Sequence, residues 1–225
     1  MSPHFPPRLD ILAPPQRRLW GELAAVPPEF VLYGGTAIAL QLGHRQSVDF
    51  DFFGTRPLDP TLLVPALPFL AAATVTQREP NTFSCLVDRG GVVKLSFFGV
   101  PRLPRLLPPL IAADNGVQVA SLLDLAGMKA SVVQMRAEAK DYLDIDAILT
   151  DGRIDLPTTL ASARAIFGQK FNPLATLKAL TWFADGTVPR LPRAVKDRLT
   201  RAACAVDPGR LPAIAPPDPN RRPTP

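Results

Sequence analysis

Cysteine is scarce in this sequence of 225 residues: only Cys85 and Cys204 are present, far apart and in unrelated contexts. Two isolated cysteines exclude a disulfide framework and a cysteine-based zinc cluster. The first residues also lack the basic and then apolar pattern of a secretory signal. We therefore expect a cytoplasmic protein, in a reducing compartment.

Long apolar helices are lacking as well. The stretch 60–77 carries no charge, but Pro60, Pro65, Pro68 and three threonines interrupt it. Proline inside a helix removes a hydrogen bond and kinks the chain, so this stretch does not suit a membrane span. We expect no membrane partner.

Proline is abundant, with 27 residues, whereas the 47% hydrophobic and 20% charged content is that of an ordinary globular protein. The formal charge of +5 is uneven. Residues 1–185 contain 17 basic and 17 acidic side chains, and residues 186–225 contain eight and three. The excess predicts a basic C-terminal segment, which either attracts RNA or is simply solvated.

The most informative stretch is 31–53. Val31–Tyr33 has the β-branched and aromatic residues of a strand, and Gly34 and Gly35 allow a tight turn. Thr36 is the expected N-cap of a helix that runs to about Leu42. Amides at such a helix start favour an anion such as a phosphate.

A second strand in this stretch alternates Asp49, Phe50, Asp51 and Phe52. Side chains alternate between the two faces of a strand, so both carboxylates share one face. At ~6 Å and an effective dielectric of ~20, their repulsion is about 3 kcal/mol. A hard divalent cation such as Mg²⁺ relieves it. The simpler alternative is an edge strand with two solvated acids.

The spacing of these groups carries a resemblance. Gly34-Gly35-Thr36, twelve residues and then Asp49-x-Asp51 resembles the signature of the DNA polymerase β-like nucleotidyltransferases. The string from Gly34 to Phe53 is similar to the AbiEii/AbiGii toxin-type nucleotidyltransferases. The resemblance implies a nucleoside triphosphate on the glycine turn and one or two Mg²⁺ (or Mn²⁺) ions on Asp49 and Asp51. Arg45, in the preceding loop, is a candidate phosphate clamp.

A second polar cluster follows in a helical region. Asp124 to Lys129, then Arg136 and Lys140-Asp141-x-x-Asp144, is similar to the second motif of the same toxin family. The resemblance implies that Lys129 contacts the triphosphate and that Asp141 or Asp144 orients it. The alternative is a set of surface salt bridges within the helical lobe, which contribute ~0–1 kcal/mol each.

One expected group is missing. Polymerase β-like enzymes commonly carry a third carboxylate on a later strand, and the strand placed to supply it here, 92–98, offers Lys94 and Ser96 instead. A serine does not replace a carboxylate as a charged ligand or base. Three explanations stay open. Two aspartates are enough for catalysis, or another acid such as Asp88 or Asp114 takes the place of the third. Alternatively, the protein binds nucleotide without efficient turnover.

The periodicity of the chain predicts an α+β fold. Further strands are expected at 74–79, 82–87, 92–98 and 117–120, and helices at 17–26, 60–72, 121–135, 140–149, 157–167, 173–184 and 192–205. Residues 1–16 and the proline-rich crossing 101–109 are expected to be irregular. We predict a nucleotidyltransferase lobe with a small mixed sheet over 1–119, a helical lobe over 120–205 and a disordered, basic, proline-rich tail over 206–225.

These observations favour a metal-dependent enzyme that transfers a nucleoside monophosphate from a nucleoside triphosphate, with Asp49, Asp51 and Lys129 as catalytic residues. The family resemblance implies a toxin that a cognate antitoxin neutralises, with RNA, such as tRNA, or a protein as the acceptor. Two alternatives stay open: a catalytically weak nucleotide-binding module, and an enzyme that modifies a small molecule such as an antibiotic. The triphosphate and the oligomeric state are left undetermined by the sequence.

Overall fold

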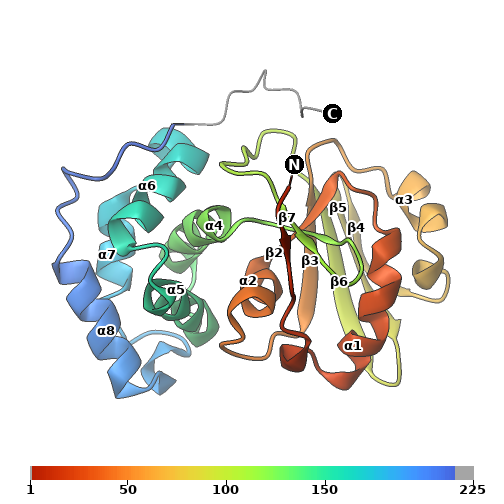
Figure 1. The fold of residues 1–225 in the computed structure, drawn as a ribbon, viewed down its shortest axis with the longest axis horizontal. Helices are drawn as coiled ribbons and strands as arrows, with labels where there is room; N and C mark the ends of the chain where they lie inside the picture. Colours follow the sequence, from red (N-terminus) through yellow and green to blue (C-terminus); the bar gives the residue numbers. More distant parts are fainter. Residues whose placement is uncertain (1, 216–225) are drawn as a thin grey trace. The chain divides into compact units, whose positions relative to one another are not determined.

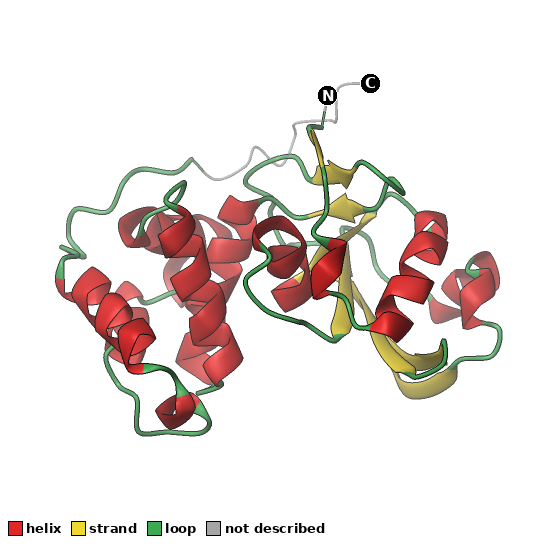
Figure 2. Ribbon diagram, turned by 60° about the horizontal axis from the view of Figure 1, so that its bottom comes forward, coloured by secondary structure: helices red, strands yellow, loops and turns green. Residues whose placement is uncertain are grey.

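The computed structural model describes residues 2–215 and divides the chain into two compact units. The first unit extends to Leu103 and includes Pro108–Ser121, whereas the second contains Pro104–Leu107 and the chain from Leu122 onward. All strands lie in the first unit, and the second unit is helical (Figure 2). Among residues 2–215, no helix combines the length and apolar character that a membrane span needs.

The strands of the described residues form one mixed sheet of eight, in the order β1-β7-β8-β2-β3-β6-β5-β4. Pairing is parallel between β1 and β7, β2 and β8, and β3 and β6, and antiparallel elsewhere. The strands are β1 (His4–Phe5), β2 (Phe30–Tyr33), β3 (Asp49–Gly54), β4 (Thr74–Glu79), β5 (Thr82–Asp88), β6 (Val92–Gly99), β7 (Leu110–Ala112) and β8 (Gln118–Val119).

Helices accompany the sheet in the first unit and make up the second (Figure 1). Three α-helices belong to the first unit, α1 (Pro14–Trp20), α2 (Gly34–Leu42) and α3 (Pro60–Ala66). The second unit contains α4 (Leu122–Met135), α5 (Ala139–Asp151), α6 (Leu156–Phe167), α7 (Pro173–Ala179) and α8 (Arg193–Cys204). Short 3-10 segments lie at Leu9–Ile11, Gly21–Ala25, Pro68–Leu70, Gly168–Lys170 and Val188–Arg190.

An aromatic cluster forms the core on one face of the sheet. Phe97 of β6 stacks on Phe52 with ring centroids 5.2 Å apart and meets the edge of Phe30 at 5.5 Å. Trp20 of α1 stacks on Phe50 at 6.1 Å, so α1 covers the same face. Because Phe50 and Phe52 alternate with Asp49 and Asp51 along β3, burying these rings leaves both acids on the opposite face.

The second unit has its own core, built from one face of each helix. Tyr142, Ile145, Leu160, Leu180 and Leu199 are among the residues that are almost completely buried there. Val206 and Leu211, within the segment predicted to be a disordered tail, also pack against this core. Residues 206–215 contain no helix or strand. The rest of the predicted tail, residues 216–225, lies outside the described residues.

Three local expectations were wrong. His4–Phe5, within the stretch 1–16 that was expected to be irregular, form a strand that pairs with Leu110–Ala112. Helix α1 begins at Pro14, because prolines fit the first turn of a helix and the Gln16 side chain accepts from the Ala13 amide at 3.2 Å. Helix α7 ends at Ala179, five residues earlier than predicted.

Phe97→Ala is expected to destabilise the protein by about 3–5 kcal/mol, because it removes a completely buried ring from the centre of the aromatic cluster. Urea unfolding measures this change. Val92→Ala on the same strand is the matched control: Val92 is 67% exposed, so its truncation should change the free energy of unfolding by less than about 0.5 kcal/mol. Equal losses for both variants would contradict the assignment of this core.

Candidate active site

The glycine turn joins β2 to α2 at the edge of the acid pair. Gly34 has a φ of +76°, which a residue with a side chain rarely adopts. A Cβ atom at Gly34 would lie 3.0 Å from Oδ2 of Asp51. The absence of a side chain therefore lets the backbone of the turn approach the Asp51 carboxylate closely.

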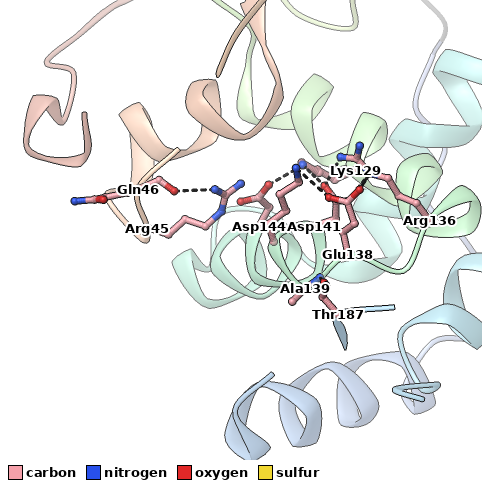
Figure 3. Close-up of polar contacts among 10 residues, drawn as sticks. Arg45, Gln46, Lys129, Arg136, Glu138, Ala139, Asp141, Asp144 and Thr187 are labelled. Carbon is pink, nitrogen blue, oxygen red and sulfur yellow. Dashed lines mark hydrogen bonds and ion pairs between the residues drawn. The ribbon is translucent and has the colours of Figure 1, made fainter. Parts of the chain in front are cut away.

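Arg45 lies against the other glycine of the turn. A Cβ atom at Gly35 would be 2.3 Å from Nη2 of Arg45 and 3.1 Å from Oγ of Ser47. Arg45 also donates from Nη1 to the Gln46 carbonyl at 2.8 Å, which fixes the guanidinium in this position (Figure 3). A permanent positive charge thus lies at the first turn of α2, where the helix amides also favour an anion.

Thr36 differs from its prediction. The N-cap of α2 is Tyr33, and Thr36 is the third residue of the helix. The helix begins two residues before Thr36 because the positive φ of Gly34 turns the strand directly into the first helical turn. The buried Thr36 hydroxyl donates to the Asp49 carbonyl. It ties the glycine turn to the acid strand and is not presented to a ligand.

Asp49 and Asp51 are both partly exposed, and the registers of the sheet define their neighbours. Asp49 pairs with Lys94 and Asp51 with Ser96 across the parallel β3–β6 ladder. Lys94 is exposed, whereas Ser96 is only 2% exposed. The position beside Asp51, where a third carboxylate was expected, therefore holds a buried, neutral hydroxyl.

The two acids considered as substitutes are held elsewhere. Asp114 accepts a hydrogen bond from Nε1 of Trp20 at 2.7 Å, and Trp20 stacks on Phe50, which projects from the opposite face of the sheet. Asp88, at the β5–β6 turn, accepts from the Gly91 amide at 2.9 Å. Within residues 2–215, no group of three or more His, Cys, Asp or Glu side chains is arranged to hold a metal ion.

The donor set of Asp49 and Asp51 nevertheless fits a magnesium ion. Both groups are hard carboxylate oxygens on one partly exposed face. Magnesium typically takes one or two protein carboxylates and completes its octahedron with waters and substrate phosphates. A site with two acids next to an anion-favouring turn therefore matches a metal that binds together with a phosphate.

A second polar cluster, which we call the lysine cluster, lies in the helical unit and comprises Lys129, Arg136, Asp141 and Asp144 (Figure 3). Nζ of Lys129 lies 2.6 Å from Oδ1 of Asp141 and 2.7 Å from Oδ2 of Asp144. Both carboxylates are fully buried, and Lys129 is only 6% exposed. Helix α5 places the two acids three residues apart, on one face, so that both reach the same ammonium.

Arg136, which follows α4, completes the cluster. Its Nε donates to Oδ2 of Asp141 at 2.8 Å and its Nη2 to Oδ1 at 3.1 Å, in a two-point contact. Burial disfavours the charged form of Asp141, but the hydrogen bond from Arg136 and the nearby charge of Lys129 outweigh it. The pKa of Asp141 is therefore held below its ordinary value of 3.8. These are not the exposed salt bridges of the simpler interpretation.

Asp124 is a residue whose part the sequence did not reveal. It is 1% exposed, and its carboxylate accepts from the amides of Leu106 at 2.7 Å and Leu107 at 3.2 Å. These bonds attach the segment Pro104–Leu107 to α4, which explains why it belongs to the second unit. The sequence did contain one signal for this role, because Asp124 lies in the first turn of a predicted helix and within a motif.

Comparisons with known proteins agree with this geometry. A family model described as "Nucleotidyl transferase AbiEii toxin, Type IV TA system" matches residues 18–207. An uncharacterized protein of Aquifex aeolicus (strain VF5) is 34% identical over 119 residues, which make up 52% of this chain and 56% of that protein. The match thus spans little more than half of that relative.

The solved structure of MenT4, a nucleotidyltransferase toxin from Mycobacterium tuberculosis, covers 85% of this chain and 82% of its own. The TM-score is 0.58 and the sequence identity 16%, so the likeness concerns the fold. The α+β prediction is confirmed, although the sheet has more strands than expected.

Asp141→Asn is expected to lower the free energy of unfolding at pH 7 by about 3 kcal/mol, because it removes one carboxylate from two cations. Since the pKa of Asp141 is lowered in the folded state, its stabilisation is present above the unfolded value of about 3.9 and is lost as pH falls through the folded value. Urea unfolding at several pH values should show the variant and wild type converging below about pH 4.

Asp197→Asn is the control for this prediction. Asp197 forms an exposed pair with Arg193 at 3.8 Å, so its replacement should change stability by less than about 1 kcal/mol at any pH. A penalty for Asp141→Asn that is equally large at pH 7 and at pH 3 would contradict the role of the Asp141 charge.

Proposed function

Because this chain belongs to the nucleotidyl transferase AbiEii toxin family and is a nucleotidyltransferase, we propose that it transfers a nucleoside monophosphate from a nucleoside triphosphate to a hydroxyl group of an RNA acceptor. The observation that carries the proposal is the arrangement in the first unit. The glycine turn, with the Arg45 guanidinium against it, lies directly beside the carboxylate of Asp51, and β3 presents Asp49 on the same face as Asp51.

The triphosphate binds at the glycine turn in this proposal. The amides of Gly34 and Gly35 and the guanidinium of Arg45 hold the phosphates that leave as pyrophosphate. The acceptor oxygen forms a bond to the α-phosphorus, the bond between that phosphorus and the α–β bridging oxygen breaks, and the hydroxyl proton passes to water. Fixed positive charge at the leaving phosphates stabilises the charge that develops there.

Asp49 and Asp51 would hold the divalent cation, Mg²⁺ or Mn²⁺, that nucleotidyltransferases of this kind generally use. Such an ion, when bound, neutralises phosphate charge and polarises the phosphorus centre. The residues themselves supply oxygen ligands from one rigid strand, and the Asp51 carboxylate lies next to the turn that carries the phosphates.

Lys129 is the third residue to which we assign a catalytic role. Two buried carboxylates hold its ammonium in one place, and Lys129 is itself almost completely buried. The two aspartates act as positioning residues for Lys129.

The family description also supports a biological setting. We propose that the protein is the toxin of a toxin–antitoxin pair, which a cognate antitoxin counteracts. Its expression should arrest the growth of the host cell. A catalytically weak nucleotide-binding module is the second candidate, because the buried Ser96 faces Asp51 at the position of the missing acid.

Asp49→Asn and Asp51→Asn are each expected to reduce nucleotide transfer by at least about a hundredfold, because a neutral amide binds a divalent cation poorly. Incubation with Mg²⁺, total cellular RNA and each radiolabelled triphosphate measures transfer. Asp59→Asn is the control: Asp59 caps α3 and Asn caps a helix equally well, so activity should be unchanged. Labelled protein instead of labelled RNA would identify a protein acceptor.

Triphosphate binding without any transfer to RNA, protein or a small alcohol would favour the catalytically weak module instead. Protection of a susceptible host from an antibiotic, without growth arrest, would favour an enzyme that modifies small molecules.

Arg45→Gln is expected to weaken triphosphate binding by about tenfold, because one charge-assisted phosphate contact is lost. Titration calorimetry with a non-hydrolysable triphosphate and Mg²⁺ measures the affinity. Arg102→Gln removes the same charge from an exposed position and should leave the affinity unchanged. Equal weakening in both variants would point to general electrostatics and not to a phosphate contact.

A further inference from the structure

Two phenylalanines lie on the same sheet face as the acid pair. Phe53 follows Asp49 and Asp51 in the alternation of β3, and it pairs with Phe98 across the parallel ladder to β6. Their ring centroids are 5.0 Å apart, and Tyr33 lies 5.0 Å from Phe53 on the other side. The acids therefore adjoin a continuous row of aromatic rings.

This pair differs in exposure from the other phenylalanines of the same strands. Phe50, Phe52 and Phe97 project from the opposite face and are completely buried. Phe53 and Phe98 are only partly buried. Partly exposed aromatic rings forfeit some of the stabilisation that burial gives, and their place beside a candidate active site suggests a ligand with a flat face.

The registers of the sheet place the aromatic pair at a defined end of the site. Tyr33 pairs with Asp51, and the chain then turns at Gly34 and Gly35, so the glycine turn lies toward the Asp49 end of β3. Phe53 lies at the other end of the acid pair. The order along the strand is therefore phosphate turn, acids and aromatic pair.

The geometry of in-line displacement then defines the side of the α-phosphorus on which each substrate lies. The attacking oxygen approaches the α-phosphorus from the side opposite to the departing pyrophosphate. With pyrophosphate at the glycine turn, the acceptor arrives from the side of Phe53 and Phe98. We propose, on the basis of the function proposed above, that these two rings stack the terminal nucleobase of the RNA acceptor and so place its hydroxyl group.

Stacking on an aromatic ring is sequence-tolerant, because every base has a π-face, and it is a common way to bind single-stranded nucleic acid. The site offers the terminal base two aromatic rings, tilted by 41° to one another, on the sheet face of the two acids. A peptide acceptor has no general need for such a surface. The proposal therefore favours an RNA end over a protein side chain as the acceptor.

Phe98→Leu and Phe53→Leu test the proposal, because leucine keeps an apolar side chain and removes the π-face. Each should raise the KM for RNA by about fivefold to tenfold, with a small change in kcat. Phe98→Tyr keeps an aromatic ring, so its KM for RNA should equal that of the wild type. Phe83→Leu is the matched control, since Phe83 is a buried ring on the other face of the neighbouring strand, and it should lower stability without raising the KM.

A binding measurement separates this proposal from the proposed function. The full-length protein, with Mg²⁺ and a non-hydrolysable triphosphate, is mixed with a short single-stranded RNA whose terminal base is the fluorescent analogue aminopurine. Stacking should quench the fluorescence in the wild type and in Asp51→Asn, but far less in Phe98→Leu. This readout does not depend on catalysis, so a wild type that binds without transfer would count against the function and not against the stacking.

Three results would overturn the proposal. The first is unchanged RNA affinity and quenching in both leucine variants. The second is a loss of triphosphate affinity that accounts for the whole effect, which would place the donor base on the rings. The third is transfer to a protein acceptor that the leucine variants leave intact.

Discussion

The parallel pairing of β3 with β6 is the constraint on which the rest of the site depends. Burying Phe50 and Phe52 in the aromatic core contributes about 1.5–3 kcal/mol for each ring. The two rings together contribute about 3–6 kcal/mol, which equals or exceeds the repulsion of about 3 kcal/mol between two carboxylates on the other face. The core thus forces Asp49 and Asp51 together on the opposite face of the sheet.

The two polar centres use charge in different ways. In the lysine cluster, Lys129, Asp141 and Asp144 are buried in direct contact, and the exposed Arg136 adds a second cation to Asp141. Burial of its charges is tolerated because each is paired and hydrogen-bonded, and the pairing fixes the Lys129 ammonium. The acid pair of β3 is partly exposed and lies next to a turn that favours anions. One centre fixes a buried lysine side chain, and the other leaves two carboxylates partly exposed.

Ser96 shows how a common fold is altered locally. The ladder to β6 places it beside Asp51, and the β5–β6 ladder places Ser84 beside Ser96, so two buried hydroxyls extend the polar row from the acid. Neutral groups here leave the negative charge of the site to Asp49 and Asp51.

The sequence by itself determined the features that depend on local pattern. The alternation of acids and phenylalanines in β3, the turn at Gly34 and Gly35, and the helical half of the chain follow from periodicity and backbone freedom. Only the tertiary structure decided which distant residues lie beside these features. Ser96 lies beside Asp51, and Arg45 lies against Gly35. Lys129 lies between Asp141 and Asp144. The structure also shows that Tyr33, and not the predicted Thr36, is the N-cap of α2. The register between distant strands depends on how those segments pack together, and the local periodicity of the sequence does not predict it.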